Sequence, residues 1–186
     1  MIGFALCGSF CTISKALEEL YRLTRDFEVQ GIVSETVFAT DTRFSLARDV
    51  VEQLKTLTGR EVIHSIVAAE PLGPKTPLEA LVICPCTGNT LAKMAAGITD
   101  TAVTMAAKAH LRSDRPLVIA LASNDALSAN LKNIGTLLCR KNVYFVPMTQ
   151  DDPEGKPHSL VADFAKLRPT LEAALAGKQY QRIFQV

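Results

Sequence analysis

Short apolar runs alternate along the chain with longer segments in which apolar residues recur every three or four positions, and this alternation is the strongest constraint on the fold. The runs are predicted to form strands at residues 2–7, 27–33, 61–67, 78–84, 116–122 and 143–146. Three of them, at residues 2–7, 116–122 and 143–146, are apolar throughout, which is typical of strands that are buried on both faces. Such strands, separated by single helices, indicate a parallel sheet.

The helical segments each have one apolar face. They are predicted at residues 12–25, 44–59, 91–98, 100–112, 127–138 and 160–175, with Asp100 as the cap of the fourth. Three prolines and a glycine predict a loop at residues 70–77, and residues 150–158 form a second, polar loop. The predicted fold is therefore a doubly wound α/β sandwich of three layers, of the flavodoxin-like or Rossmann-like type.

Length and charge limit the organisation of the chain and its partners. With 186 residues, 48% of them hydrophobic and 21% charged, it is expected to form one domain over residues 1–186 that ends in a loop and helix at residues 148–178. A net charge of +1 gives no electrostatic reason to bind nucleic acid. Residues 1–10 are apolar but lack a basic leader and are too short for a membrane span, so a cytoplasmic protein without membrane association is expected.

The five cysteines are expected to be free thiols, since an odd number without an export signal argues against a disulfide framework. Cys7, Cys11, Cys84 and Cys86 would lie at the ends of two strands that can be neighbours. Their spacings are not those of a zinc ribbon, and buried cysteine often serves as a small apolar side chain. No metal site is predicted.

Small polar residues collect directly after four of the predicted strands. In chain order they are Gly8, Ser9 and Thr12; Ser34 and Thr36; Thr87, Gly88, Asn89 and Thr90; and Ser123 and Asn124. In an open parallel sheet, ligands bind at the edge formed by the carboxyl ends of the strands. The free N–H groups and helix dipole at residues 87–90 suit a phosphate, and Gly88 would let the backbone come close. Thr87 by itself could equally be a helix cap, but four clusters on one edge favour a ligand site.

Other phosphate-binding patterns do not fit the loop at residues 7–12. It lacks the glycine spacing of the dinucleotide fingerprint and the lysine of the P-loop, which disfavours NAD and ATP. A response regulator needs carboxylates after its first strand, where this chain has Cys7 and Gly8.

The segment Pro85-Cys86-Thr87-Gly88-Asn89-Thr90, followed by Ala92-Lys93 and Gly97-Ile98-Thr99-Asp100, resembles the signature of the homo-oligomeric flavin-containing cysteine decarboxylases and the flavin prenyltransferases. The resemblance covers roughly residues 1–147. It implies FMN as the cofactor and a homo-oligomer, a trimer or a multiple of three, that closes the flavin site between neighbouring copies. The expected FMN-binding residues are Ser34, Thr87, Asn89 and Thr90 at the phosphate, Ser9, Phe10 and Asn124 near the isoalloxazine ring, and Gly8, Thr12, Gly88 and Ser123 around them.

The chain departs from the decarboxylases of this family in two places. Glu70-Pro71-Leu72 stands where their histidine is expected, and residues 151–159 contain no cysteine, so cysteine decarboxylation is not expected. The segment Gly155-Lys156-Pro157-His158-Ser159-Leu160 is similar to that of family members that act within oxidoreductases. This similarity implies a separate, dehydrogenase-like partner protein and a small dicarboxylate substrate. A prenyltransferase or decarboxylase, and a non-catalytic nucleotide-binding protein, remain alternatives.

His158 and Lys156, in the polar loop, are the candidate catalytic residues. An imidazole and an ammonium group could pair with a dicarboxylate or transfer protons. His64 lies on or near the weakest predicted strand and is expected to be structural.

Overall fold

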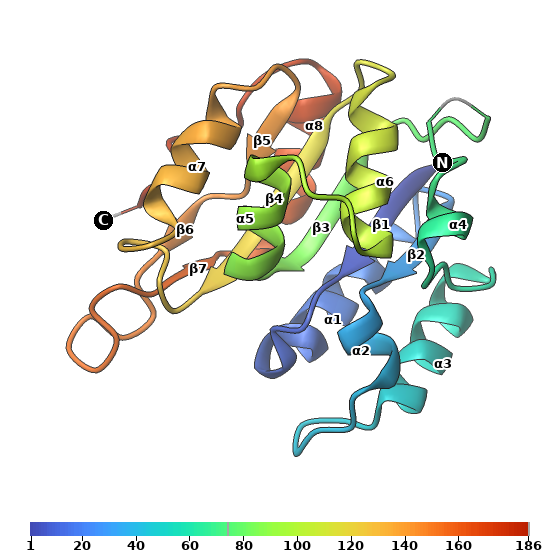
Figure 1. Ribbon diagram of the computed structural model, residues 1–186, viewed down its shortest axis with the longest axis horizontal. Helices are drawn as coiled ribbons and strands as arrows, with labels where there is room; N and C mark the ends of the chain where they lie inside the picture. The colour runs from blue at the N-terminus through green and yellow to red at the C-terminus, as the bar shows by residue number, and fades with distance from the viewer. Residues whose placement is uncertain (74, 186) are drawn as a thin grey trace.

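The computed structural model describes residues 1–73 and 75–185 and contains one central sheet (Figure 1). Five of its strands lie parallel in the order β2-β1-β3-β4-β5. They are β1 (Ile2–Leu6), β2 (Val29–Val33), β3 (Leu81–Cys86), β4 (Leu117–Ser123) and β5 (Val143–Phe145). Every residue of β1, β3 and β4 is buried, as their apolar runs predict. The flavodoxin-like strand order confirms the predicted fold class.

Helices cover both faces of the sheet and divide the core into two apolar clusters. One face carries α1 (Ile13–Leu23), α3 (Ala47–Thr58) and α8 (Leu167–Leu175), and the other carries α4 (Ile66–Ala69), α5 (Gly88–Ala96), α6 (Ala102–Leu111) and α7 (Leu131–Leu138). Figure 1 shows α5, α6 and α7 in front of the strands. Except in the C-terminal segment, both ends of each predicted helix lie within four residues of their predicted positions, and Phe44, Ile98 and Leu127 lie just outside the helices that they were predicted to join. None of the described helices is long and apolar enough to cross a membrane.

The predicted strand at residues 61–67 is wrong. Ile63 forms only an isolated bridge with Ile32, and the chain then enters α4. The hydroxyl of Ser65 accepts the N–H of Ala68 at 3.2 Å and so caps this short helix. A side-chain hydroxyl that accepts the first N–H groups of a helix favours the helix over pairing in a strand. The apolar residues at 61–67 are too few to favour a strand against this cap. The loop predicted at residues 70–77 contains turns, and its Pro74 lies outside the described residues.

The C-terminal segment is not the single helix predicted at residues 160–175. Leu160–Ala162 is a strand, β7, that pairs antiparallel with the carboxyl end of β4 and with β6 (Met148–Thr149). A 3-10 helix at Phe164–Lys166 then leads into α8. The helical spacing of Leu160 and Phe164 is misleading because Leu160 belongs to the apolar cluster on one face of the sheet and Phe164 to the cluster on the other.

The start of α6 differs by one residue from the prediction. Its cap is Thr101, whose hydroxyl accepts the N–H of Thr104 at 3.1 Å, while the Thr104 hydroxyl accepts the N–H of Thr101 at 3.1 Å. This reciprocal arrangement is a capping box. Asp100 instead pairs with Lys93, with 2.9 Å between the carboxylate oxygen and the ammonium nitrogen.

Thr101→Ala is therefore expected to lower the free energy of unfolding by about 1 kcal/mol, because it removes the helix cap. Asp100→Ala is the matched control and should cost less than about 0.5 kcal/mol, the usual value of an exposed ion pair. Urea denaturation of both variants measures the difference. Equal losses, or a larger loss for Asp100→Ala, would contradict the assignment of the cap.

Candidate functional site

A cleft of about 680 Å³ opens at the carboxyl ends of β1, β3 and β4. This volume lies within the range of about 300–1,000 Å³ that is usual for small-molecule sites. Nine of the eleven residues predicted to bind FMN line the cleft, and they are Gly8, Ser9, Phe10, Thr12, Thr87, Gly88, Asn89, Ser123 and Asn124. The parallel sheet thus brings together polar residues that are far apart in the sequence.

One wall of the cleft is the turn between β1 and α1. The Thr12 hydroxyl donates to the carbonyl of Ser9 at 2.8 Å and lies 3.1 Å from the Ser9 hydroxyl. These bonds hold the turn closed just before α1 begins. The turn places two hydroxyl groups and the Phe10 ring at the cleft.

The start of α5 also lines the cleft. The Thr87 hydroxyl accepts the N–H of Thr90 at 3.2 Å, so Thr87 is the helix cap. The first N–H groups of a helix have no partner within it, and the positive end of the helix dipole lies at the same point. Capping by Thr87 and anion binding are compatible here, because Gly88 and Asn89 begin the helix at the cleft.

Gly88 packs closely against the loop that follows β4. A Cβ atom at this position would lie 2.4 Å from the Ser123 hydroxyl oxygen, 2.6 Å from the Asn130 amide nitrogen and 2.9 Å from an Asp125 carboxylate oxygen. Glycine is therefore required so that the loop after β4 can pack against the start of α5. Close approach of a ligand to the backbone is not needed to explain it.

Asp125 is a cleft residue that the sequence patterns did not predict. The Ser123 hydroxyl donates to its carboxylate at 2.5 Å, and the Asn130 amide donates to both carboxylate oxygens at 2.9 Å. The Asn133 amide in turn donates to the Asn130 side-chain oxygen at 2.8 Å. The hydrogen bonds from Ser123 and Asn130 hold the pKa of Asp125 below its usual value, so this wall carries a fixed negative charge at neutral pH. The spacing Ser123-x-Asp125 after a buried strand was the available signal.

Ser34 and Thr90 are predicted FMN-binding residues that do not belong to the cleft lining as the structure describes it. Ser34 is buried, and its hydroxyl accepts the N–H of Val37 at 3.4 Å to cap the short helix α2 (Glu35–Ala39). Thr90 is also buried, with its hydroxyl 3.1 Å from that of Thr87. The hydroxyl of each residue thus takes part in a contact within the protein.

Lys156 lies at the cleft, but His158 does not. Lys156 pairs with Asp151 at 2.9 Å, and Ser159 donates to the same carboxylate at 2.7 Å. The Ser159 hydroxyl and the Lys156 ammonium lower the pKa of Asp151, and the ion pair raises the pKa of Lys156. His158 is exposed and absent from the cleft lining within the described residues, while its carbonyl accepts the N–H of Leu127 at 2.9 Å.

Arg43 and Phe44 also line the cleft and were not predicted as site residues. They come from the segment between α2 and α3, and the Arg43 guanidinium lies 4.8 Å from the centre of the Phe44 ring. No motif in this segment marks it as part of a site. His64 lies elsewhere, stacked on Phe38 with 3.9 Å between the ring centres.

The three buried cysteines near the cleft are unreactive thiols at neutral pH. Cys7, Cys84 and Cys86 are buried, and burial raises the pKa of Cys7 to about 11 and the pKa values of the other two well above the usual value. They therefore stay protonated at neutral pH. Cys11 is exposed at the cleft, and Cys139 is exposed elsewhere. Within the described residues, no group of three or more His, Cys, Asp or Glu side chains is placed to hold a metal ion.

The match of residues 1–164 to the flavoprotein family decides the family of this chain. The chain belongs to the flavoprotein family. The family resemblance predicted from residues 85–100 is thereby confirmed, and the cleft described above lies within the matched region.

This flavoprotein is 45% identical over 183 residues to the B-subunit of dipicolinate synthase from Bacillus subtilis (strain 168), covering 98% of this chain and 92% of that protein. The crystal structure of the B-subunit of dipicolinate synthase from Bacillus halodurans C matches with a TM-score of 0.91 and 44% identity, over 100% of this chain and 95% of the other. A dodecameric FMN-dependent UbiX-like decarboxylase from Escherichia coli O157:H7 matches with a TM-score of 0.62 and 25% identity, over 79% and 80% of the two chains. The chain is thus a homologue of the dipicolinate synthase B-subunit.

The packing at Gly88 yields a stability test. Gly88→Ala is expected to destabilise the protein by about 1–3 kcal/mol, because the added methyl group displaces the side chains of Ser123 and Asn130. Gly135→Ala, in α7, is the matched control, since its Cβ would have no neighbour within 4 Å. It should stabilise the protein by up to about 1 kcal/mol through helix propensity. Thermal denaturation compares the two, and unchanged stability of Gly88→Ala would contradict the packing described.

Proposed function

We propose that this flavoprotein binds FMN in the cleft and serves as the FMN-binding B-subunit of a dipicolinate synthase. In this role it is part of an oxidoreductase that converts a dihydrodipicolinate-type intermediate to dipicolinate, together with a dehydrogenase-like A-subunit. The observation that carries the proposal is the cleft lined by both the start of α5 and the Gly8–Thr12 turn, in a chain 45% identical to a dipicolinate synthase B-subunit.

The residues at the cleft fit the chemical parts of FMN. The Ser9 hydroxyl and the N–H groups that begin α5 are donors of the kind that a phosphate requires, while the Thr12 and Thr87 hydroxyls donate within the protein and hold these donors in place. Phe10 and Phe44 offer ring faces for a flat isoalloxazine, and Asn124 is exposed and can bond to its polar edge. Ser34 and Thr90 lie outside the described cleft lining, but the Ser34 hydroxyl only accepts the N–H of Val37 and so keeps its own proton for a phosphate.

The two carboxylates of the cleft limit where the phosphate can bind. Asp125 is held negative beside Gly88, and Asp151 is neutralised by Lys156. A phosphate dianion is repelled by the first and affected little by the second. We therefore place the phosphate toward the Ser9 and Thr12 side of α5, with the ring extending toward Asn124.

FMN and the protein have different roles in the proposed reaction. When bound, FMN supplies two-electron redox chemistry, and the protein supplies binding, orientation and electrostatics. Lys156 and Arg43 are cations at the cleft that can pair with the carboxylates of a small dicarboxylate substrate. We assign His158 no direct catalytic role, because it is exposed and does not belong to the described cleft lining.

The proposed setting is the mother-cell cytoplasm of a sporulating bacterium. We further propose a homo-oligomer, a trimer or a multiple of three, and the dodecameric E. coli relative supports this. In such an assembly, a neighbouring copy could close the cleft beside the loop at residues 150–159.

FMN binding is tested by titrating the purified protein and following the visible absorption of the flavin. FMN is expected to bind more than tenfold tighter than riboflavin, because charge-assisted hydrogen bonds to a phosphate are each worth about 1.5–3 kcal/mol. Asn89→Ala should weaken FMN binding several-fold. Thr136→Ala, exposed on α7 and remote from the cleft, is the control. Equal affinities for FMN and riboflavin would contradict a phosphate-binding site in the cleft.

The reaction is tested by measuring dipicolinate formation with this chain and its dehydrogenase-like partner, together and apart. Formation should depend on both proteins and on FMN. Lys156→Ala is expected to lower kcat/KM about tenfold by removing a cation from the substrate, whereas His158→Ala should change it less than twofold.

Two results would favour the alternative functions. Full activity of a variant that binds no flavin would indicate an assembly protein without a catalytic role. Turnover of a prenyl phosphate or a cysteinyl substrate by this chain alone would indicate a prenyltransferase or a decarboxylase.

A further inference from the structure

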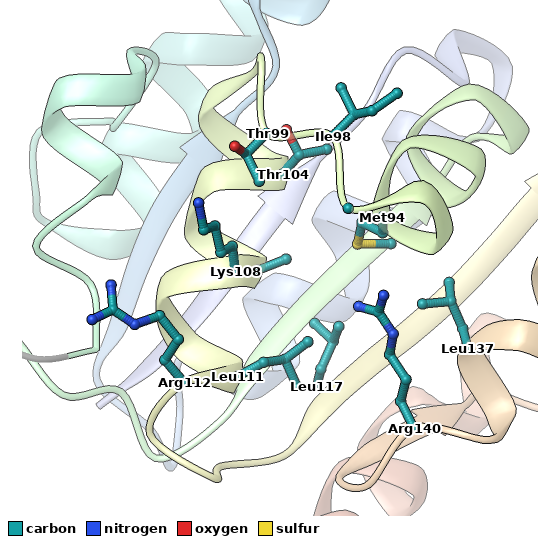
Figure 2. A pocket seen from close by; sticks show the side chains of 12 residues that line it. Met94, Ile98, Thr99, Thr104, Lys108, Leu111, Arg112, Leu117, Leu137 and Arg140 are labelled. Atoms are coloured by element: carbon teal, nitrogen blue, oxygen red, sulfur yellow. The ribbon is translucent and has the colours of Figure 1, made fainter.

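A second cavity of about 300 Å³ lies among α5, α6 and α7, and Figure 2 shows the side chains around it. We name it the α5–α7 groove. Its apolar surface comes from Met94, Leu111, Leu117 and Leu137. The groove and the cleft share no lining residue among those described. The cleft is lined by Gly88 and Asn89 at the start of α5 and the groove by Met94 and Gly97 toward its end, so that Asn89 and Met94 are about 7.5 Å apart along the helix. The groove is therefore separate from the proposed FMN site.

Three cations line the α5–α7 groove without a matching anion. They are Lys108, Arg112 and Arg140, all exposed, and none of them forms an ion pair within residues 1–73 and 75–185. No aspartate or glutamate lines the groove in the same part of the chain. The Arg140 guanidinium has one long contact, 3.5 Å to the carbonyl of Ala95. The groove thus combines an apolar floor with cations that form no ion pair among the described residues, while Lys108 and Arg112 also line a neighbouring pocket that contains Glu70.

The cations are arranged around the apolar floor. Figure 2 shows Lys108 on one side of the groove and Arg140 on the other, with Leu111 and Leu117 between them. A ligand that matches this pattern has a flat apolar body and a carboxylate at each end. Guanidinium groups bind carboxylates through two parallel hydrogen bonds, which favours such an anion over a neutral ligand.

We propose that the α5–α7 groove binds a small, planar ring dicarboxylate. The anion-binding character follows from the groove alone, and the choice of a ring dicarboxylate rests on the proposed function, whose product belongs to this class. A volume of about 300 Å³ suits one small molecule. A protein partner would instead need a surface of roughly 1,200–2,000 Å² in total.

The test is isothermal titration of the full chain with pyridine-2,6-dicarboxylate. One site per chain is expected in the groove, and its affinity should fall about tenfold or more in Lys108→Ala and in Arg140→Ala. Lys132→Ala is the matched control, because Lys132 is exposed on α7 outside the groove and should leave the affinity unchanged. Pyridine-2-carboxylate, with one carboxylate, should bind at least tenfold more weakly. Circular dichroism checks that the variants fold, and Arg140→Gln replaces Arg140→Ala if the latter does not.

Comparison with the cleft keeps the two proposals distinguishable. The affinity of the groove should be the same with and without saturating FMN and should not change in Lys156→Ala. Absence of FMN binding would therefore contradict the proposed function but would not affect the proposal of a dicarboxylate site in the groove. Binding that survives Lys108→Ala and Arg140→Ala, or that is lost in Lys156→Ala, would place the dicarboxylate in the cleft and overturn the inference. Absence of dicarboxylate binding, with weaker association of the dehydrogenase-like partner in the groove variants, would overturn it in favour of a protein-docking surface.

Discussion

The parallel pairing of β1 with β3 and of β3 with β4 is the constraint on which the rest of the structure depends. The three strands are buried on both faces and run in one direction, so the loops that follow them meet at one edge of the sheet. Ser9 and Ser123 line the same cleft for this reason. The carboxyl end of β4 also pairs with β7, which brings the loop with Asp151 and Lys156 to the same edge.

The electrostatics of the cleft depend on helix geometry more than on side-chain charge. Asp125 and Asp151 oppose Arg43 and Lys156, so the formal charges at the cleft cancel. The positive end of the α5 dipole and the N–H groups of its first turn remain available to an anion. The fixed negative charge of Asp125 makes one end of the cleft unfavourable for an anion. For this reason we place the phosphate of FMN at the other end and its ring toward Asn124.

Much of this arrangement could be predicted from local sequence patterns, and the failures have specific physical causes. Largely apolar runs predicted β1, β3 and β4, because burial on both faces leaves few polar positions in such strands. Leu160 fits the helical spacing of its neighbours, yet its backbone pairs with Ser123, a long-range contact that periodicity does not contain.

The polar clusters located the cleft. They could not show that Ser34 turns inward to cap α2, because only the local backbone path decides where a hydroxyl points. Asp125 and Arg43 were missed for a related reason: the first acts through contacts with Asn130 and Ser123, and the second reaches the cleft from a segment between two helices.

The central claim, that the hydroxyls and N–H groups at the carboxyl edge of the sheet form an FMN site, is tested most directly by a crystal structure of the protein grown with FMN. We expect density for the phosphate between the Gly8–Thr12 turn and the start of α5, with the ring toward Asn124. FMN bound elsewhere, or a phosphate seated against Asp125, would contradict the account.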